Sequence, residues 1–92
     1  MFVVVAYDVT STRRRNRVAK ILANYGDRVN LSVFECVFKK AETLHALKTE
    51  IQKAIKPKKD HVRYYVICRD CRSKISVQGI GKVVESSIVR FA

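Results

Sequence analysis

The chain has 92 residues, with 19 lysine and arginine residues against 8 acidic ones, a formal net charge of +11. Hydrophobic residues make up 48% of it, which predicts a folded globule and argues against a disordered basic tail. We expect a single domain over residues 1–92 whose charge suits nucleic acid or another anionic partner. No apolar stretch reaches the ~20 residues of a membrane span, and the N-terminus has a strand pattern without signal-peptide features. We therefore expect a cytoplasmic protein with no membrane partner.

The first predicted element is an apolar strand over residues 2–8 that stops at Asp8. Its β-branched run is typical of a central strand buried on both faces. A helix is predicted next, with Thr10, Ser11 and Thr12 as acceptable N-caps and Gly26 as its stop. The apolar face of this helix is formed by Val18, Ile21, Leu22 and Tyr25.

Cationic side chains open this helix, from Arg13 to Arg17. Arginines in a first turn oppose the helix macrodipole, at roughly 0.3–1 kcal/mol each. An anionic partner such as phosphate would offset that penalty. A solvated helix start explains the same pattern equally well.

Residues 28–38 alternate with period two and are largely apolar on both faces, so a second copy of the chain could cover one of them. A second helix is predicted over about 43–55, with a lysine-rich exposed face, followed by a strand over 62–68. A short strand around 75–77 and a terminal strand over 88–91 complete the pattern.

This order predicts an α+β fold, a ferredoxin-like βαββαβ sandwich in which two helices cover one face of an antiparallel sheet. The core would span about residues 2–68. Such a fold needs a hairpin between its second and third strands, yet residues 28–40 contain no Gly or Pro. A tight turn of ordinary residues and one long bent strand both remain open.

The cysteines do not form a metal or disulfide framework on sequence grounds. Cys68 and Cys71 have the spacing of half a zinc site, but there is no second C-x-x-C and no histidine at a ligand-like spacing. Two reduced thiols at the end of a strand are the favoured interpretation, and any role for them is open. Five acidic residues are expected to be solvated surface charges: Glu42, Glu50, Asp60, Asp70 and Glu85.

Three segments, residues 5–9, 14–22 and 25–35, together resemble the second of the two core CRISPR-associated proteins of spacer acquisition. Residues 62–68 and the C-terminal Gly-x-Gly continue the similarity more weakly. This resemblance implies a ferredoxin-like homodimer that acts in antiviral defence. It also implies that the C-terminal segment, about residues 73–92, adds a strand to the sheet of the partner.

The resemblance further implies a metal-dependent endonuclease that hydrolyses phosphodiester bonds in RNA or DNA, together with a larger integrase-like partner. Its metal-binding and catalytic carboxylate would be Asp8, with Tyr7 as a second catalytic residue. The nucleic-acid-binding positions would be Arg15, Arg17, Arg28 and Phe34.

One carboxylate per chain is little for a nuclease. Mg²⁺ keeps several waters, however, so two copies of Asp8 facing each other across a two-fold axis, with a substrate phosphate, could hold it. Mn²⁺ is a second candidate, and Glu35 is the second choice of carboxylate. No histidine lies in the motif region. Tyr7 and Phe34 have a strong alternative interpretation, because strand aromatics are usually core residues.

A second hypothesis needs no chemistry at all: a basic dimeric scaffold that binds DNA and bridges integrase subunits. RNA, single-stranded DNA and duplex DNA all remain open as substrates. No recognition helix is evident, so we expect backbone and shape recognition rather than base specificity.

Overall fold

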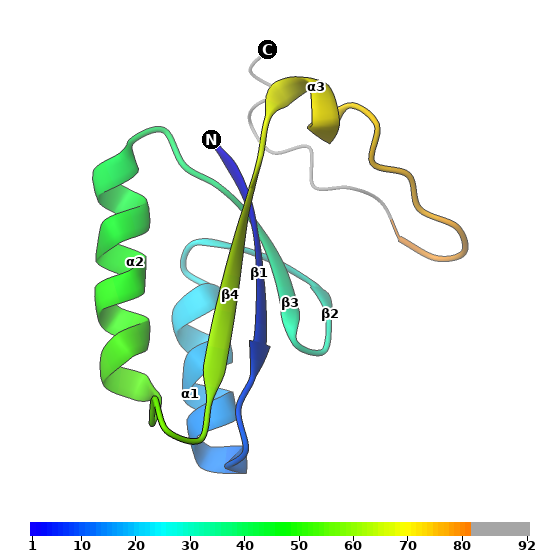
Figure 1. The fold of residues 1–92 in the computed structure, drawn as a ribbon. Coiled ribbons are helices and arrows are strands. Elements are labelled where there is room, and N and C mark those ends of the chain that lie inside the picture. Colours follow the sequence, from blue (N-terminus) through cyan, green and yellow to red (C-terminus); the bar gives the residue numbers. More distant parts are fainter. Residues whose placement is uncertain (82–92) are drawn as a thin grey trace.

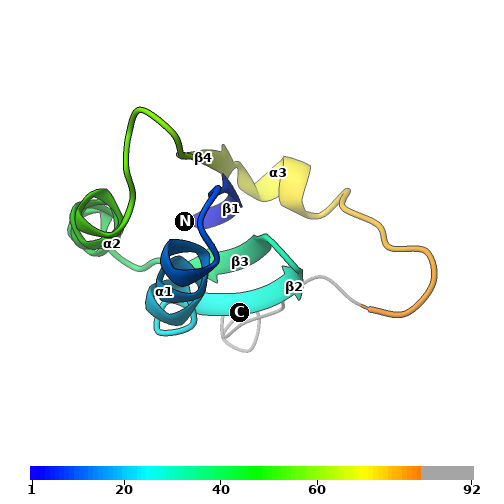
Figure 2. The same cartoon turned by 90° about the horizontal axis from the view of Figure 1, so that it is seen from below.

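The computed structural model describes residues 1–81, and residues 82–92 lie outside the described part. Its elements follow the order β1 (Phe2–Asp8), α1 (Thr12–Leu22), β2 (Gly26–Asn30), β3 (Val33–Val37), α2 (Ala41–Ala54), β4 (His61–Ile67) and the short α3 (Arg69–Arg72). The strands form one antiparallel sheet in the order β2-β3-β1-β4, and α1 and α2 pack side by side on one face of it (Figures 1 and 2). The predicted α+β, ferredoxin-like architecture is confirmed.

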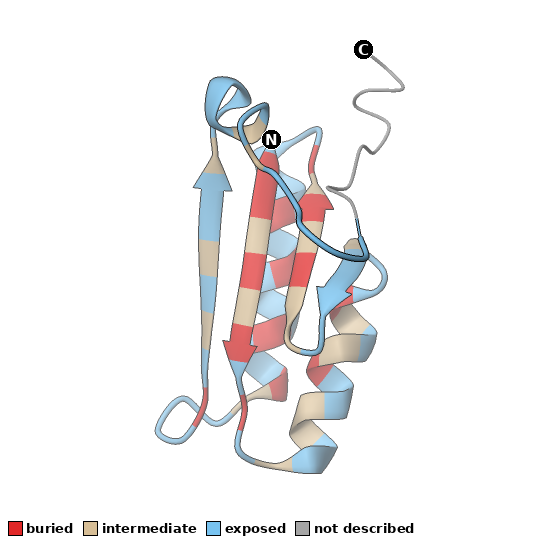
Figure 3. Ribbon diagram, turned by 90° about the vertical axis from the view of Figure 1, so that its right-hand side faces the viewer, coloured by how far each residue is buried: buried red, intermediate tan, exposed pale blue. Residues whose placement is uncertain are grey.

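Strand β1 lies between β3 and β4 and alternates strictly between the two faces of the sheet. Val3, Val5 and Tyr7 are buried beneath the helices, whereas Val4 and Ala6 are only half-buried on the other face (Figure 3). The expectation that this strand is buried on both faces is therefore wrong for the chain by itself. Within residues 1–81, α1 and α2 cover only one side of the sheet (Figure 2), and on the other side Phe2, beneath Arg72 of α3, is the one buried residue of β1.

The helices bury the faces that their periodicity predicts. In α1, Val18 and Leu22 are buried, and the N-cap Ser11 accepts a hydrogen bond from the backbone N–H of Arg14 at 3.3 Å. The helix ends at Leu22 with Ala23 in a right-handed conformation, so Gly26 is not its stop but the first residue of β2. In α2 the predicted stripe is buried at Leu44, Leu47 and Ile51.

Residues 26–37 form a hairpin, which confirms the tight-turn alternative. The turn consists of Leu31 and Ser32, and the Asn30 side chain accepts the Leu31 N–H at 2.7 Å. The backbone carbonyl of Ser32 accepts the N–H of Tyr7 at 3.0 Å, which ties the turn to β1. Asn side chains commonly satisfy the backbone of such turns, so no glycine is needed.

The segment after α3 differs from the prediction. Residues 73–81 contain no strand, so the short strand expected around residues 75–77 is absent. This segment extends away from the sheet on its uncovered side and has no strand of the described chain beside it to pair with (Figures 1 and 3). The strand predicted over residues 88–91 lies outside the described residues. Within residues 1–81, no helix has the length and apolarity that crossing a membrane would require.

The sheet thus has an uncovered side, which we call the open face. It consists of the strand residues that point away from the helices, chiefly Phe2, Val4, Ala6, Val33, Val37, Tyr65 and Ile67, with Asp8, Glu35, His61 and Arg63 among them. Most of these side chains are apolar. An antiparallel sheet with one solvated face normally shows polar residues there, so the open face has the character of an interface.

Gly26 is required by the close approach of β2 to β3. A Cβ at this position would lie 2.3 Å from the backbone oxygen of Glu35 and 2.5 Å from Cys36 Sγ. We therefore expect Gly26→Ala to destabilise the protein by about 1–3 kcal/mol, measured as the urea midpoint of unfolding. Asn24→Ala, an exposed change in the same connection, should stay within about 0.5 kcal/mol of wild type. Equal midpoints for both variants would contradict this packing argument.

Candidate metal and nucleic-acid site

The carboxylate of Asp8 lies at the C-terminal end of β1 on the open face. The side chain is exposed, and it forms no hydrogen bond or ion pair with any of residues 1–81. Asp8 is therefore available to a ligand or to a second chain.

His61 lies directly opposite Asp8 in the pairing of β1 with β4. Opposed residues of antiparallel strands share a face, with Cβ atoms about 4.5–5.5 Å apart. No histidine lies near Asp8 in the sequence, but the expectation that none lies near it in the folded chain is wrong. His61 is exposed, and it is 53 positions away in sequence, so only the strand register brings it to Asp8.

The arginines in the first turns of α1 differ in their contacts and in their exposure. Arg15 is held over the β1–α1 connection, where its guanidinium donates to the Val9 carbonyl at 3.1 Å and to Thr12 Oγ1 at 2.9 Å. Arg13 and Arg17 are exposed. Arg15 thus lies just beyond the end of β1, and Arg17 remains accessible to a phosphate backbone.

Arg14 and Asp60 form a partly buried ion pair that the sequence did not predict. The Nε atom of Arg14 donates to Asp60 Oδ2 at 2.7 Å, and Nη2 donates to Oδ1 at 3.1 Å. The same carboxylate accepts the backbone N–H groups of Thr10 at 3.0 Å and Lys56 at 2.9 Å. The Thr10 hydroxyl completes the set at 3.2 Å.

The expectation that Asp60 is a solvated charge is wrong, because its side chain is fully buried in this network. The guanidinium of Arg14 and the two backbone N–H groups hold the pKa of Asp60 well below its usual range, against the opposing effect of burial. One of the arginines that oppose the helix dipole therefore has its anionic partner within the chain. No local pattern marks this pair, because its members are 46 residues apart.

Tyr7, Arg28 and Phe34 come together on the helix-covered side of the sheet. The Tyr7 hydroxyl donates to the Leu31 carbonyl at 3.0 Å, and Arg28 Nη2 donates to that hydroxyl at 3.1 Å. The guanidinium carbon of Arg28 is 5.5 Å from the centre of the Phe34 ring. These contacts join β1, β2 and β3 near the hairpin turn.

The two aromatic members of this cluster are nearly inaccessible, with 5% of Tyr7 and 2% of Phe34 exposed. Because residues alternate along β1, Tyr7 points to the opposite face from Asp8. This geometry favours the core interpretation of both aromatics. Their catalytic and nucleic-acid-binding roles remain predictions.

Among residues 1–81, no group of three or more histidine, cysteine, aspartate or glutamate side chains could surround a metal ion. Glu35 is on the open face, but it pairs with Val4, four residues from Asp8 and thus about 13 Å along the strand. Among residues 1–81, Asp8 is therefore the carboxylate available at this end of β1. That donor set fits Mg²⁺ only if a second carboxylate and a substrate phosphate complete it.

The fold and this site define a class: a basic ferredoxin-like domain with a largely apolar, partly exposed sheet face and an exposed carboxylate, Asp8, at the end of its first strand. Residues 1–75 match the family model described as CRISPR associated protein Cas2. The chain belongs to this family.

Two relatives illustrate the similarity at the level of sequence. The "CRISPR-associated endoribonuclease Cas2 1" of Chloroflexus aurantiacus is 36% identical over 95% of this chain and 94% of its own length. The "CRISPR-associated endonuclease Cas2" of Halalkalibacterium halodurans is 38% identical over 82% of each chain.

Solved structures agree with this assignment. Crystalline Cas2 of Streptococcus pyogenes is 33% identical, with a TM-score of 0.74, over 86% of this chain and all of that one. A chain of a partial Cas6-RT-Cas1–Cas2 complex is 26% identical, with a TM-score of 0.74, over 83% of this chain and 88% of that one.

The Arg14–Asp60 pair makes stability depend on pH. Since the folded-state pKa of Asp60 is depressed, its stabilisation is present above the unfolded value of about 3.9 and is lost as the pH falls further. We expect Asp60→Asn to lower the melting temperature clearly at neutral pH. The difference in melting temperature between wild type and the variant should then shrink as the pH falls below about 3.9 and the Asp60 carboxylate of wild type becomes protonated. Circular dichroism at a series of pH values measures this difference.

Asp27→Asn serves as the control for this measurement, because Asp27 is exposed on the edge strand. Its melting temperature should follow wild type at every pH. A gap between wild type and Asp60→Asn that stays constant down to about pH 2 would show that the carboxylate charge is not what stabilises the junction.

Proposed function

We propose that this chain is a Mg²⁺-dependent endonuclease of CRISPR spacer acquisition that acts as a homodimer, with Asp8 from each copy at its centre. The observation that carries the proposal is the exposed and unpaired carboxylate of Asp8 at the end of β1. The names of the relatives, endoribonuclease and endonuclease, support phosphodiester cleavage in RNA or DNA.

The open face supports the homodimer. A 92-residue chain buries a limited core, and residues 1–81 leave most of the apolar residues on one side of the sheet half-buried or exposed (Figure 3). A second copy packed against it would remove those side chains from water. A symmetric contact would also repeat Asp8 across the axis, giving the two carboxylates that one chain lacks.

The segment that follows α3 supports an exchange of C-terminal strands. Residues 73–81 leave the domain on the side of the open face, where Val77 is 48% exposed and Ile80 is fully exposed. An arm that departs from its own sheet in this direction is placed to reach a partner packed there. Its continuation would pair with an edge strand of that partner.

Asp8 and the nearby arginines would have different roles in the proposed cleavage. Two copies of Asp8 would hold Mg²⁺, which when bound polarises the phosphate and activates water. Arg17 would bind the nucleic-acid backbone through its bidentate guanidinium fork, and Arg15 would hold the β1–α1 connection beside it. Arg28 would brace the hairpin through Tyr7 while its exposed edge contacts phosphate.

A specific observation keeps the scaffold as a second candidate. Asp8 alone is a weak metal site among residues 1–81, whereas a net charge of +11 would favour nucleic-acid binding whether or not the chain cleaves its ligand. The partial complex named Cas6-RT-Cas1–Cas2 contains a chain of this fold. By analogy, the dimer would bridge subunits of a larger integrase-like protein.

Asp8→Asn separates the two candidates. The variant should reduce cleavage of labelled RNA and duplex DNA in Mg²⁺ to the level that wild type shows in EDTA, because a neutral amide is a poor ligand for this cation. Its dimer mass and its affinity for nucleic acid should not change. Asp70→Asn, which alters an exposed aspartate on α3, should cleave like wild type. Equal residual cleavage by wild type and Asp8→Asn would identify a contaminant and favour the scaffold.

Tyr65→Glu tests the dimer interface. Tyr65 is 46% exposed on the open face opposite Val4, so the change is tolerable in a monomer but places a charge in the proposed contact. We expect the mass measured by light scattering to fall toward that of one chain. Val66→Glu is the matched control, because Val66 is the next residue, is 60% exposed and points to the other face. A dimer that persists in Tyr65→Glu would overturn this placement of the interface.

A further inference from the structure

We propose that one end of the helix layer binds the phosphate backbone of a nucleic-acid duplex, and that the turn between α2 and β4 is one of its contacts. We call this turn, residues 56–59, the lysine turn, after Lys56, Lys58 and Lys59. Its role rests on the proposed function, because it presupposes nucleic-acid binding. It requires neither cleavage nor Asp8.

Positive charge is concentrated in two segments, residues 8–17 and 53–61. Together they hold eight of the nineteen lysine and arginine residues but only two of the eight acidic ones. One acid is Asp8, on the open face, and the other is Asp60, which Arg14 neutralises. That ion pair also joins the two segments where α1 begins and α2 ends (Figure 1). We call the seven remaining cations the basic end: Arg13, Arg15, Arg17, Lys53, Lys56, Lys58 and Lys59.

The lysine turn is held in one shape by hydrogen bonds of its own backbone. The N–H groups of Lys59 and Asp60 both donate to the Lys56 carbonyl at 2.8 Å, and the Lys56 N–H donates to Asp60 Oδ2 at 2.9 Å. Pro57 restricts the backbone further. The three lysine side chains are exposed and form no hydrogen bond or ion pair with any of residues 1–81. Because the backbone is ordered in advance, less conformational entropy is lost when the lysines bind a ligand.

The composition of the basic end favours a phosphate backbone over other anionic partners. The large hydrophobic side chains that residues 1–81 expose all lie on other segments: Met1, Val29, Leu31, Tyr65, Val66, Val77 and Ile80. A membrane-binding surface inserts apolar side chains, and sites for single-stranded nucleic acid stack bases on aromatic ones. A duplex presents one negative charge about every 1.7 Å along its axis, which cations can bind without contacting the bases.

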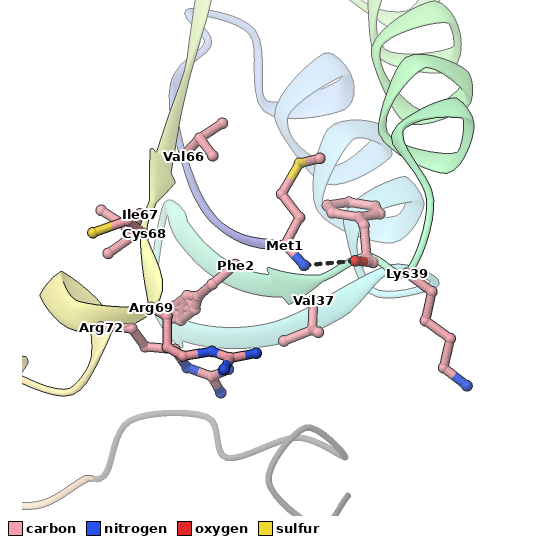
Figure 4. A pocket seen from close by; sticks show the side chains of 10 residues that line it. Met1, Phe2, Val37, Lys39, Val66, Ile67, Cys68, Arg69 and Arg72 are labelled. Carbon is pink, nitrogen blue, oxygen red and sulfur yellow. Dashed lines mark hydrogen bonds between the residues drawn. The ribbon is translucent and has the colours of Figure 1, made fainter. Parts of the chain in front are cut away.

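Cations also lie at the opposite end of the sheet, but in different surroundings. Lys39, Arg69 and Arg72 line a pocket whose other residues include Phe2 and Val37 of the open face (Figure 4). A second copy of the chain packed on that face would cover this pocket. The cations of the basic end lie on α1, α2 and the lysine turn rather than on the sheet, so the proposed dimer contact leaves them accessible.

The test measures the Kd of a duplex of about 20 base pairs by fluorescence anisotropy at a series of salt concentrations. Every protein carries Asp8→Asn and is kept in EDTA, so a failure of the proposed nuclease activity does not affect the result. Lys58→Gln/Lys59→Gln should weaken binding at least about tenfold at about 0.1 M salt. It should also lower the salt slope by about two, because each phosphate contact contributes about 0.9.

Lys20→Gln/Lys40→Gln is the matched control, because it removes the same charge from the other end of the helix layer. Lys20 is in the last turn of α1, and Lys40 is the N-cap of α2. Kd and salt slope should stay close to those of the Asp8→Asn parent. An equal loss in both double variants would show that net charge alone governs binding and would overturn the assignment, as would an unchanged slope in Lys58→Gln/Lys59→Gln. Polyglutamate that displaces the duplex as well as unlabelled duplex of equal charge would overturn the phosphate backbone as the ligand.

Discussion

The hydrogen-bonded pair of Arg14 and Asp60 is the interaction on which the end of the sheet that carries Asp8 depends. It joins the start of α1 to the connection before β4, and through Thr10 it also fixes the chain between β1 and α1. A buried carboxylate with five donors keeps its charge only in this exact arrangement of segments. The position of Asp8, two residues before Thr10, follows from that constraint.

The same pair offsets part of the unfavourable interaction between the macrodipole of α1 and the arginines of its first turn. Asp60 neutralises Arg14, and the carbonyl of Val9 accepts from Arg15, so these two side chains are committed to the fold. The cationic surface that remains, including Arg17, is the part available to nucleic acid. Neighbouring arginines of this turn thus differ in environment: Arg14 and Arg15 bond to other groups of the chain, whereas Arg17 is exposed.

In residues 1–81, one face of the sheet is covered by helices and the other is largely half-buried or exposed. Helices α1 and α2 bury Val3, Val5 and Tyr7, while most apolar residues of the open face are half-buried or exposed (Figure 3). Asp8 belongs to that second surface by the alternation of β1. The proposed metal site would therefore depend on dimer formation. The contact that would cover the open face is also the one that would bring two copies of Asp8 together.

Local patterns alone determined the strand that ends at Asp8, the buried stripe of α2 and the α+β order, because periodicity and composition act over a few neighbouring residues. They also identified the family through its motif. They could not predict the burial of Asp60 or the pairing of His61 with Asp8. Those features depend on which strands become neighbours and in what register, and contacts between residues about 50 positions apart arise only when the whole sheet has formed.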